Sequence, residues 1–381
     1  MNSKWLVAIG LVLALALAGC TSAPAPAAPA PEEAAAPAEE AAPAEEEAAP
    51  AEEEAAPAEE EAAPAEEEAA PAEEEAAPAA EAPTIALVYG VAGDGFYITM
   101  EKGLRDKAAE VGAEAVADGP SQFDAVQQTP ILDAMVSRGV DAICIAATDK
   151  QAMIEPMQRA YDSGIPIISV DTFVGDGDYE NGPVTFPLSY VGSDNVEGGR
   201  IACNAVIEAM GGEGKMYIQN IKPGVSTTDQ REQGCIEAIE ATEGKVTLVG
   251  VDYNDDSAAK AAEQTSAVLQ REPDLGAIFG TNLFSAQGAA QAVKNAGLTG
   301  IVKVANFDAP EAAIVDLRNE VVDIVIAQLP YEIGQKCVEY SMLALEGRED
   351  EIPARWPTGY VVITRDNVDS EEAQMAIYKS E

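Results

Sequence analysis

The stretch DAICIAATDKQAMIEPMQRAYDSGIPIISVDT, residues 141–172, decides the fold of this chain. It begins with a short apolar run, DAICIA (141–146), and ends with a second one, IPIISVD (165–171). Between them, residues 151–162 have the length and the apolar period of an amphipathic helix. Continuous apolar strands separated by a helix indicate a parallel sheet that is covered on both faces. The stretch therefore predicts one β-α-β unit of an α/β protein.

The same pattern of strand and helix recurs along the chain. Further apolar runs of strand length are IALVYG (85–90), KMYIQN (215–220), VTLVGVDY (246–253), LGAIFG (275–280), IVKVANFD (301–308) and DIVIAQL (323–329). Further stretches of helical length and period are 96–111, 124–137, 196–210, 229–240 and 258–270. A single doubly wound sheet rarely holds this many units, so the chain from Thr84 to Glu381 predicts two similar parallel-sheet α/β lobes.

The N-terminus has the features of an export signal. Lys4 supplies a positive charge, residues 5–18 are almost wholly apolar, and an Ala-Gly pair precedes Cys20. The apolar run is short for a membrane span and typical of a secretory signal peptide. The cysteine after the small pair resembles a bacterial lipobox, in which the thiol is acylated. We therefore expect residues 1–19 to be removed, and Cys20 to anchor the exported protein to a membrane of the cell envelope.

The segment 20–83 has a repetitive composition of Ala, Pro and Glu. Its seven-residue PAEEEAA period places prolines at Pro43, Pro50, Pro57, Pro64, Pro71 and Pro78. The AEEEAA units favour helix, but a proline every seventh residue interrupts each helix before it reaches a stable length. The segment offers no aromatic residue and no Leu, Ile or Val to bury. We predict a disordered stalk.

The charge balance narrows the classes of partner. The chain has 67 acidic and 22 basic residues, and 20 of the acids lie in the stalk, so the globular part is also strongly acidic. This argues against nucleic acid and against an anionic membrane surface as partners. The chain has no histidine, which excludes imidazole triads and histidine-ligated metal sites. We expect no metal and no cofactor.

Polar and aromatic side chains gather directly after the predicted strands. In a parallel α/β sheet these positions meet at the carboxyl edge, where ligands bind. Carboxylates accept hydrogen bonds from vicinal hydroxyls, amides donate and accept, and aromatic faces pack on the CH surface of a sugar ring. The set favours a polyhydroxylated ligand, although the same residue types also cap helices. The candidate ligand-binding residues are Asp94, Phe96, Tyr97, Asp171, Thr172, Asp229, Arg231, Asn282, Phe284, Asp308 and Gln328.

Several longer strings match one known family. They are IALV followed by GDGFYITMEKGL, then DAICIAATD, GIPIISVDT, YVGSDNVEGGRIA, STTDQREQG, EPDLGAIFGTNLFSAQGAAQAVKNAG, VKVANFDA and IAQLPYEIGQK. In this order and spacing they resemble the ribose-type (type 1) periplasmic binding proteins, the solute receptors of sugar ABC transporters. The resemblance implies two lobes joined by three hinge crossovers that close on a ligand. It places 84–193 and 329–357 in the N-terminal lobe, and 194–328 and 358–381 in the C-terminal lobe.

The resemblance also implies which residues bind the ligand. They are Asp94, Phe96, Asp171, Asp229, Asn282, Asp308 and Gln328, with Arg231 nearby. The chain departs from the aldose-binding pattern at Asp94, where Asn is common, and at Thr172 and Asp229, where Arg is common. Losing two guanidinium forks and gaining two carboxylates makes the expected cleft acidic. We therefore expect a polyol, a deoxy- or amino-sugar, or another small hydroxylated or cationic solute, in place of a simple ribose, glucose or galactose.

Three functional hypotheses follow. The leading one is a lipid-anchored monomer that captures such a solute by hinge closure and delivers it to an ABC permease with its ATPase. The alternative is the same fold acting as a sensor that presents a sugar or signal molecule to a chemotaxis or kinase receptor. A surface protein whose acidic stalk is its purpose is the third. An enzyme is not expected, because GVAGDG (90–95) lacks the order of a dinucleotide loop and the strand-end carboxylates serve as hydroxyl acceptors.

Four cysteines lie in the globular part of the chain. Cys203 and Cys235 fall in successive predicted helices and pair in an oxidising compartment if the fold brings them close, which their spacing leaves open. Cys144 lies in the middle of a predicted strand and Cys337 on the buried face of a predicted helix. We expect Cys144 to act as a small buried apolar residue.

Overall fold

The computed structural model describes residues 82–378. The expected signal peptide, the expected lipidation site at Cys20 and the Ala/Pro/Glu repeats lie outside the described residues. Within 82–378, no helix combines the length and the apolar character that crossing a membrane requires.

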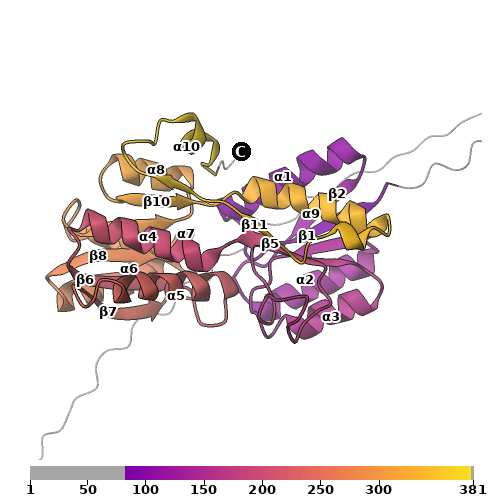
Figure 1. Ribbon diagram of the computed structural model, residues 1–381, viewed down its shortest axis with the longest axis horizontal. Helices are drawn as coiled ribbons and strands as arrows, with labels where there is room; N and C mark the ends of the chain where they lie inside the picture. The colour runs from indigo at the N-terminus through magenta and orange to yellow at the C-terminus, as the bar shows by residue number, and fades with distance from the viewer. Residues whose placement is uncertain (1–81, 379–381) are drawn as a thin grey trace, which may run out of the picture. The chain divides into compact units, whose positions relative to one another are not determined.

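The first lobe, drawn in indigo to magenta with a yellow-orange return, is an α/β sandwich (Figure 1). Its elements are β1 (Thr84–Val88), α1 (Gly95–Val111), β2 (Glu114–Asp118), α2 (Ala125–Arg138), β3 (Ala142–Ile145), α3 (Ile154–Asp162), β4 (Ile167–Val170), β5 (Ser189–Ser193), α9 (Pro330–Leu345), the 3-10 turn η1 (Glu349–Glu351) and β11 (Arg355–Thr358). The strand order is β11-β5-β4-β3-β1-β2, and every pairing is parallel. The central strands β3 and β4 are buried along their whole length, which explains their continuous apolar sequences.

The second lobe repeats this plan with a different edge. Its elements are α4 (Asn195–Ala209), β6 (Gly214–Asn220), α5 (Ser226–Glu240), β7 (Val246–Tyr253), α6 (Ala258–Arg271), β8 (Leu275–Gly280), α7 (Leu283–Asn295), β9 (Lys303–Phe307), α8 (Glu311–Arg318), β10 (Ile324–Ala327), β12 (Val361–Ile363) and α10 (Glu371–Met375). The strand order is β12-β10-β9-β8-β6-β7, and only the β10–β12 pairing within this described sheet is antiparallel. The prediction of two similar parallel-sheet α/β lobes is confirmed.

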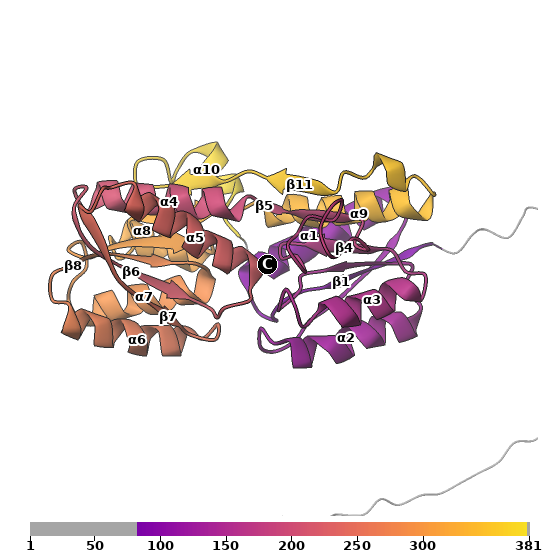
Figure 2. The same cartoon turned by 60° about the horizontal axis from the view of Figure 1, so that its bottom comes forward.

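The chain passes between the lobes three times: after β5, after β10, and between β11 and β12 (Figure 2). Buried side chains at the three crossovers are hydrogen-bonded to one another. Ser193 Oγ donates to Gln328 Oε1 at 2.9 Å and lies 2.8 Å from Thr358 Oγ1. Each crossover therefore contributes one residue to a single polar contact chain at the hinge.

The helix that carries Arg231, α5, packs closely against α4. Gly199 of α4 faces α5, and a Cβ at this position would overlap the carbonyl oxygen of Arg231. Gly234 of α5 faces α4 in the same way, where a Cβ would overlap the carbonyl oxygen of Val196. Only glycine permits this approach of the two backbones. The second glycine of the GG pair in SDNVEGGR thus permits the close approach of α4 and α5.

Each lobe contains one disulfide. Cys203 of α4 is bonded to Cys235 of α5, with a Cα–Cα distance of 5.1 Å. Cys144 of β3 is bonded to Cys337 of α9, with a Cα–Cα distance of 6.0 Å. The expectation that Cys144 acts as a small buried apolar residue is wrong, because the return of the chain lays α9, with Cys337, against β3. Both bridges lie within a lobe, so neither restrains motion at the hinge.

Candidate ligand-binding site

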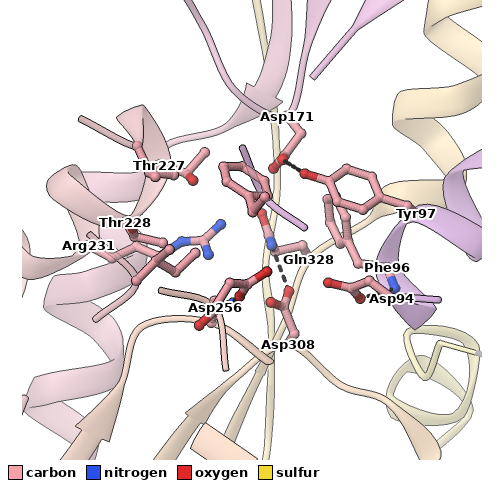
Figure 3. Close-up of a pocket in the computed structure, with 14 residues that line it drawn as sticks. Asp94, Phe96, Tyr97, Asp171, Thr227, Thr228, Arg231, Asp256, Asp308 and Gln328 are labelled. Carbon is pink, nitrogen blue, oxygen red and sulfur yellow. Dashed lines mark hydrogen bonds between the residues drawn. The ribbon is translucent and has the colours of Figure 1, made fainter. Parts of the chain in front are cut away.

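A cavity lies between the lobes at the carboxyl ends of their strands (Figure 3). Of the eleven residues expected from the sequence, the structure brings eight to the cavity wall. These are Asp94, Phe96, Tyr97, Asp171, Arg231, Asn282, Asp308 and Gln328. The remaining lining residues are Phe123, Ile221, Val225, Thr227, Thr228 and Asp256. The cavity is thus formed by segments that are far apart in the sequence and that the fold brings together.

Two lining residues also cap helices. Asp94 is the N-cap of α1, and its Oδ1 accepts a hydrogen bond from the Phe96 backbone N–H at 2.8 Å. Asn282 is the N-cap of α7, and its Oδ1 accepts from the Ser285 N–H at 3.2 Å. The Asn282 Nδ2 donates to Asp256 Oδ1 at 2.7 Å. Capping and cavity lining are therefore compatible, because the cap holds each side chain at the carboxyl edge of the sheet.

Asp171 and Asp308 directly follow β4 and β9 in a backbone conformation that favours glycine. Their φ angles are 59° and 74°. Such a conformation costs about 1–3 kcal/mol and persists only where the surroundings hold it. Asp171 Oδ2 accepts from the Tyr97 hydroxyl at 2.8 Å, and Asp308 Oδ1 accepts from Gln328 Nε2 at 2.7 Å. These bonds keep both carboxylates at the cavity (Figure 3).

Arg231 is the one basic side chain on the cavity wall, and it is only 2% exposed. Its Nε donates to Asn195 Oδ1 at 2.9 Å, and its Nη1 donates to the Thr281 carbonyl at 3.0 Å. The guanidinium lies 3.9 Å from the centroid of the Phe307 ring. Nη2 is buried and has no hydrogen-bond partner among the described residues. A buried unpaired donor costs about 1–3 kcal/mol, which makes Nη2 a candidate donor to a ligand.

Aromatic rings form the first-lobe part of the wall. Phe96 and Tyr97 begin α1, and their ring centroids are 5.2 Å apart with an angle of 81° between the planes. Phe123, from the loop between β2 and α2, completes this part of the wall. Their apolar surfaces suit the CH face of a small ring, while the Tyr97 hydroxyl is engaged by Asp171.

The charged residues on the wall are four aspartates and one arginine. Within 82–378, no group of three or more Asp, Glu or Cys side chains is arranged to hold a metal ion. Carboxylate oxygens accept hydrogen bonds from the hydroxyl groups of organic molecules.

Burial raises the pKa of three of these carboxyls. Burial, and then the neighbouring Asp308, hold the pKa of Asp94 well above its usual range. Burial raises the pKa of Asp171 to about 6, although the positive charge of Arg231 opposes the change. Burial likewise raises the pKa of Asp256 to about 6. Ligand hydroxyls that donate to these carboxyls would replace the water that burial has removed.

Two expected residues lie off the wall. Thr172 is fully buried, and its N–H donates to the Val170 carbonyl at 2.6 Å in the tight turn at Asp171. Phe284 follows the cap of α7 and packs, partly buried, against the hydrophobic core. Each is a sequence neighbour of a lining residue, but the turn and the helix direct adjacent side chains to different sides.

Asp229, also expected on the wall, lies at the rim of the cleft. Its Oδ2 is 2.6 Å from Lys150 Nζ of the first lobe, and its carboxylate accepts from the Gly224 N–H at 3.2 Å. The guanidinium that the family pattern suggested at this position is instead supplied by Arg231. The two arginines of the aldose-binding pattern are absent at positions 172 and 229, and Arg231, which was expected near the site, lies on the cavity wall.

The period of α5 explains this difference. The helix begins at Ser226, three residues before the predicted start. At 3.6 residues per turn, Thr227 and Thr228 share a face with Arg231, and all three line the cavity. Asp229 projects from another side of the helix.

Asp256 is the charged lining residue that sequence analysis missed. It follows β7 in the run Asn254-Asp255-Asp256, so the strand-end rule used for the other strands would have found it. Thr227 and Thr228 carried the same strand-end signal. Ile221, Val225 and Phe123 are apolar loop residues, and no local pattern distinguishes them from core positions.

Comparison with known families identifies the class of protein. The chain matches the periplasmic binding protein domain over residues 85–349, and it belongs to this family. The ribose import binding protein of Bacillus subtilis is 26% identical over 266 residues, which are 70% of this chain and 83% of the relative. The D-ribose/D-allose-binding protein of Pseudomonas aeruginosa is 31% identical over 234 residues, which are 60% and 71% of the two chains.

Solved structures show the same relationship. An ABC transporter solute-binding protein from Agrobacterium vitis, bound with α-D-tagatopyranose, is 44% identical with a TM-score of 0.76, covering 78% of this chain and 99% of that chain. A solute-binding protein from Actinobacillus succinogenes with bound D-allose is 28% identical with a TM-score of 0.68, covering 74% and 98%. The resemblance to ribose-type binding proteins is confirmed, and these relatives are named as binding proteins of transport systems, not as enzymes.

Proposed function

We propose that this protein is the solute-binding component of an ABC importer and captures a monosaccharide between its two lobes. The observation that carries the proposal is the unpaired Nη2 of Arg231 on a wall that also presents carboxylates and aromatic rings. A monosaccharide matches this wall, because its hydroxyls donate to carboxylates, its oxygens accept from a guanidinium and its CH face packs on rings.

The ligand class follows from the balance of donors and acceptors. Four carboxylates offer acceptors, whereas Arg231 offers one free donor, so a solute with several hydroxyls is favoured over one that presents anionic groups. The relative that is 44% identical carries α-D-tagatopyranose. D-tagatose is therefore the first candidate, and D-allose and D-ribose follow.

Contacts at the rim support capture by closure. The Lys150 N–H donates to the Gly224 carbonyl at 2.9 Å, and Lys222 Nζ donates to the Phe123 carbonyl at 2.7 Å, both across the cleft. A solute that touches both walls would stabilise this arrangement, and a permease would then recognise the loaded form.

The proposed location is the cell envelope. Residues 1–20 have the pattern of a signal peptide and lipidation site, and two disulfides in the globular part fit an oxidising compartment. We propose a monomer that is tethered through Cys20 and the Ala/Pro/Glu stalk, within reach of a permease and its ATPase. Mass spectrometry of the N-terminus would test the anchor, since an unmodified Cys20 contradicts it.

Isothermal titration of the full chain in detergent tests solute capture. The panel is D-tagatose, D-allose, D-ribose, galactitol, D-glucosamine and spermidine. Saturable one-to-one binding of a neutral sugar is expected, and a ligand at a thousand times its Kd should add about 4 kcal/mol to the free energy of unfolding. Binding of glucosamine or spermidine alone would overturn the neutral-sugar assignment. A panel without any binding would overturn the monosaccharide proposal.

A further inference from the structure

Tyr378 comes from the C-terminal segment and reaches the ligand cavity from behind. It follows α10, is only 2% exposed, and pairs with Pro310 in an isolated parallel bridge. Its backbone N–H donates to the Ala309 carbonyl at 2.9 Å. The segment is thereby attached to the loop after β9, which carries Asp308.

The Tyr378 hydroxyl connects two cavity residues. It accepts from the Gln328 backbone N–H at 2.9 Å and donates to Asp308 Oδ1 at 3.0 Å. Gln328 Nε2 donates to the same Oδ1 at 2.7 Å. Both hydrogen bonds to the Asp308 carboxylate therefore fall on one oxygen, which orients the side chain and leaves Oδ2 without a donor among the described residues.

The Tyr378 ring touches the opposite lobe. It packs edge to face on Phe96 of α1, with 5.8 Å between the ring centroids. Phe96 belongs to the aromatic part of the cavity wall, whereas Tyr378 itself does not line the cavity. One side chain thus supports a carboxylate of the second lobe and a ring of the first.

The hydroxyl also joins the binding site to the hinge. Gln328 occupies the crossover after β10 and accepts from Ser193 Oγ at the crossover after β5. Ser193 Oγ in turn contacts Thr358 at the third crossover. The chain of contacts from Thr358 to Tyr378 is buried throughout and ends on Asp308, whose φ of 74° requires support.

We propose that Tyr378 is a positioning residue for the binding site, whose hydroxyl holds Asp308 and the Gln328 backbone in the geometry that grips a solute. The inference rests on the proposed capture of a monosaccharide. It gives the C-terminal segment a role in affinity although no atom of Tyr378 lines the cavity.

Tyr378→Phe tests the proposal, because it removes the hydroxyl and keeps the ring on Phe96. The matched control is Tyr217→Phe, which removes a hydroxyl bonded to Asp252 and Gln219 in the sheet of the second lobe, away from the cavity wall. Both full-length variants are titrated with D-tagatose in detergent, well below their unfolding midpoints. Losing a hydrogen bond to a carboxylate predicts about tenfold weaker binding for Tyr378→Phe and unchanged binding for Tyr217→Phe.

The measurements separate the two proposals. If the wild type binds none of the sugars, solute capture itself fails. If the wild type binds D-tagatose and Tyr378→Phe binds equally well, the positioning role is overturned. A merely structural role predicts lower unfolding midpoints for both variants and unchanged affinity for both. If another sugar of the panel proves to be the ligand, that sugar replaces D-tagatose in the same titrations.

Discussion

The two lobes share one fold but present different chemistry to the cavity. The first lobe contributes the three aromatic rings of the wall, together with Asp94 and Asp171. The second contributes the guanidinium, the two threonines, Asn282 and two further aspartates. Part of the difference arises after the first strand of each lobe, where GDGFY follows β1 and supplies two of the rings, and KPGVSTTDQR follows β6 and supplies the threonines and the arginine. Two lobes with the same fold can therefore take different roles, because one wall supplies aromatic rings and the other supplies most of the polar groups.

The lobes also differ in the position of their disulfide bonds along the chain. The disulfide of the second lobe joins cysteines that are 32 positions apart in two adjacent helices. The disulfide of the first lobe joins cysteines that are 193 positions apart. The first lobe is built from two separate parts of the chain, and its disulfide secures the returning helix α9 to the sheet.

The largest expected effect is the loss of unfolding free energy when one of these disulfides is removed, and the loss should differ between the two lobes. Chain entropy predicts a loss of about 5 kcal/mol for Cys144→Ala with Cys337→Ala, and about 4 kcal/mol for Cys203→Ala with Cys235→Ala. Guanidinium unfolding of both double variants measures the losses. Equal losses, or a larger loss in the second lobe, would break the comparison.

The next largest effect concerns the polar wall. Arg231→Lys keeps the charge but loses the fork, so we expect about 100-fold weaker binding of the sugar. Arg200→Lys is the control, because Arg200 lies on the neighbouring helix α4 and pairs with Glu197 and Glu237 at the surface. Titration calorimetry of both variants measures the effect. If the two substitutions weakened binding equally, the polar role of the second-lobe wall would be contradicted.

A smaller effect is the pH dependence of the ligand-free protein. Asp171 and Asp256, one from each wall, have pKa values raised to about 6 by burial. A raised carboxyl pKa stabilises the folded state below the unfolded pKa of about 4, and this stability is lost as the pH rises through 6. We expect the unfolding midpoint to fall between pH 4.5 and 7.5, and Asp256→Asn to reduce the fall by roughly 2–4 °C.

The same test applies to the carboxyl of the first lobe. Asp171→Asn should act in the same direction as Asp256→Asn, because burial is the main cause for both. Differential scanning calorimetry of the two variants and the wild type across this range measures the effect. If the unfolding midpoints of all three proteins changed equally with pH, neither carboxyl would be responsible for the pH dependence.

The smallest effect is expected at the rim. The Lys150–Asp229 pair joins the lobes but is partly exposed, with side-chain exposures of 32% and 26%. Such a pair contributes about 0.2–1 kcal/mol, so Lys150→Met should weaken binding roughly twofold to fivefold. Lys102→Met is the control, because Lys102 pairs with Asp106 within the first lobe. Titrations at low and high salt would refute a rim contribution if both variants matched the wild type.

Much of the fold was predictable because its strands carry local patterns. The strands β1, β3 and β4 are short apolar runs, and the helices between them show a helical period. Three strands of the first lobe escaped the pattern, and one of them is the edge strand β11, whose sequence is RWPT. β2 is an edge strand with the partly exposed sequence EAVAD, and β5 has the small and polar sequence SYVGS. Neither is a continuous apolar run, although β5 is buried.

The candidate site was predictable at strand ends and much less so within helices. Asp94, Asp171 and Asp308 were expected because each follows an apolar strand. Asp229 and Arg231 were both expected on the wall, but they lie two positions apart on α5 and therefore project from nearly opposite sides of the helix. The strand-end rule did not take this helical period into account, so it could not separate the lining residue from its neighbour.

The sequence by itself determined the repeated strand-helix pattern, the acidic character and the carboxylates at the strand ends, because hydrophobic period and residue type are local properties. Only the tertiary structure decided that Cys337 meets Cys144, that Asp229 meets Lys150 and that Tyr378 supports Asp308. These contacts join residues 193, 79 and 70 positions apart. Their distances depend on how sheets, crossovers and the returning C-terminal segment pack together, which no local pattern encodes.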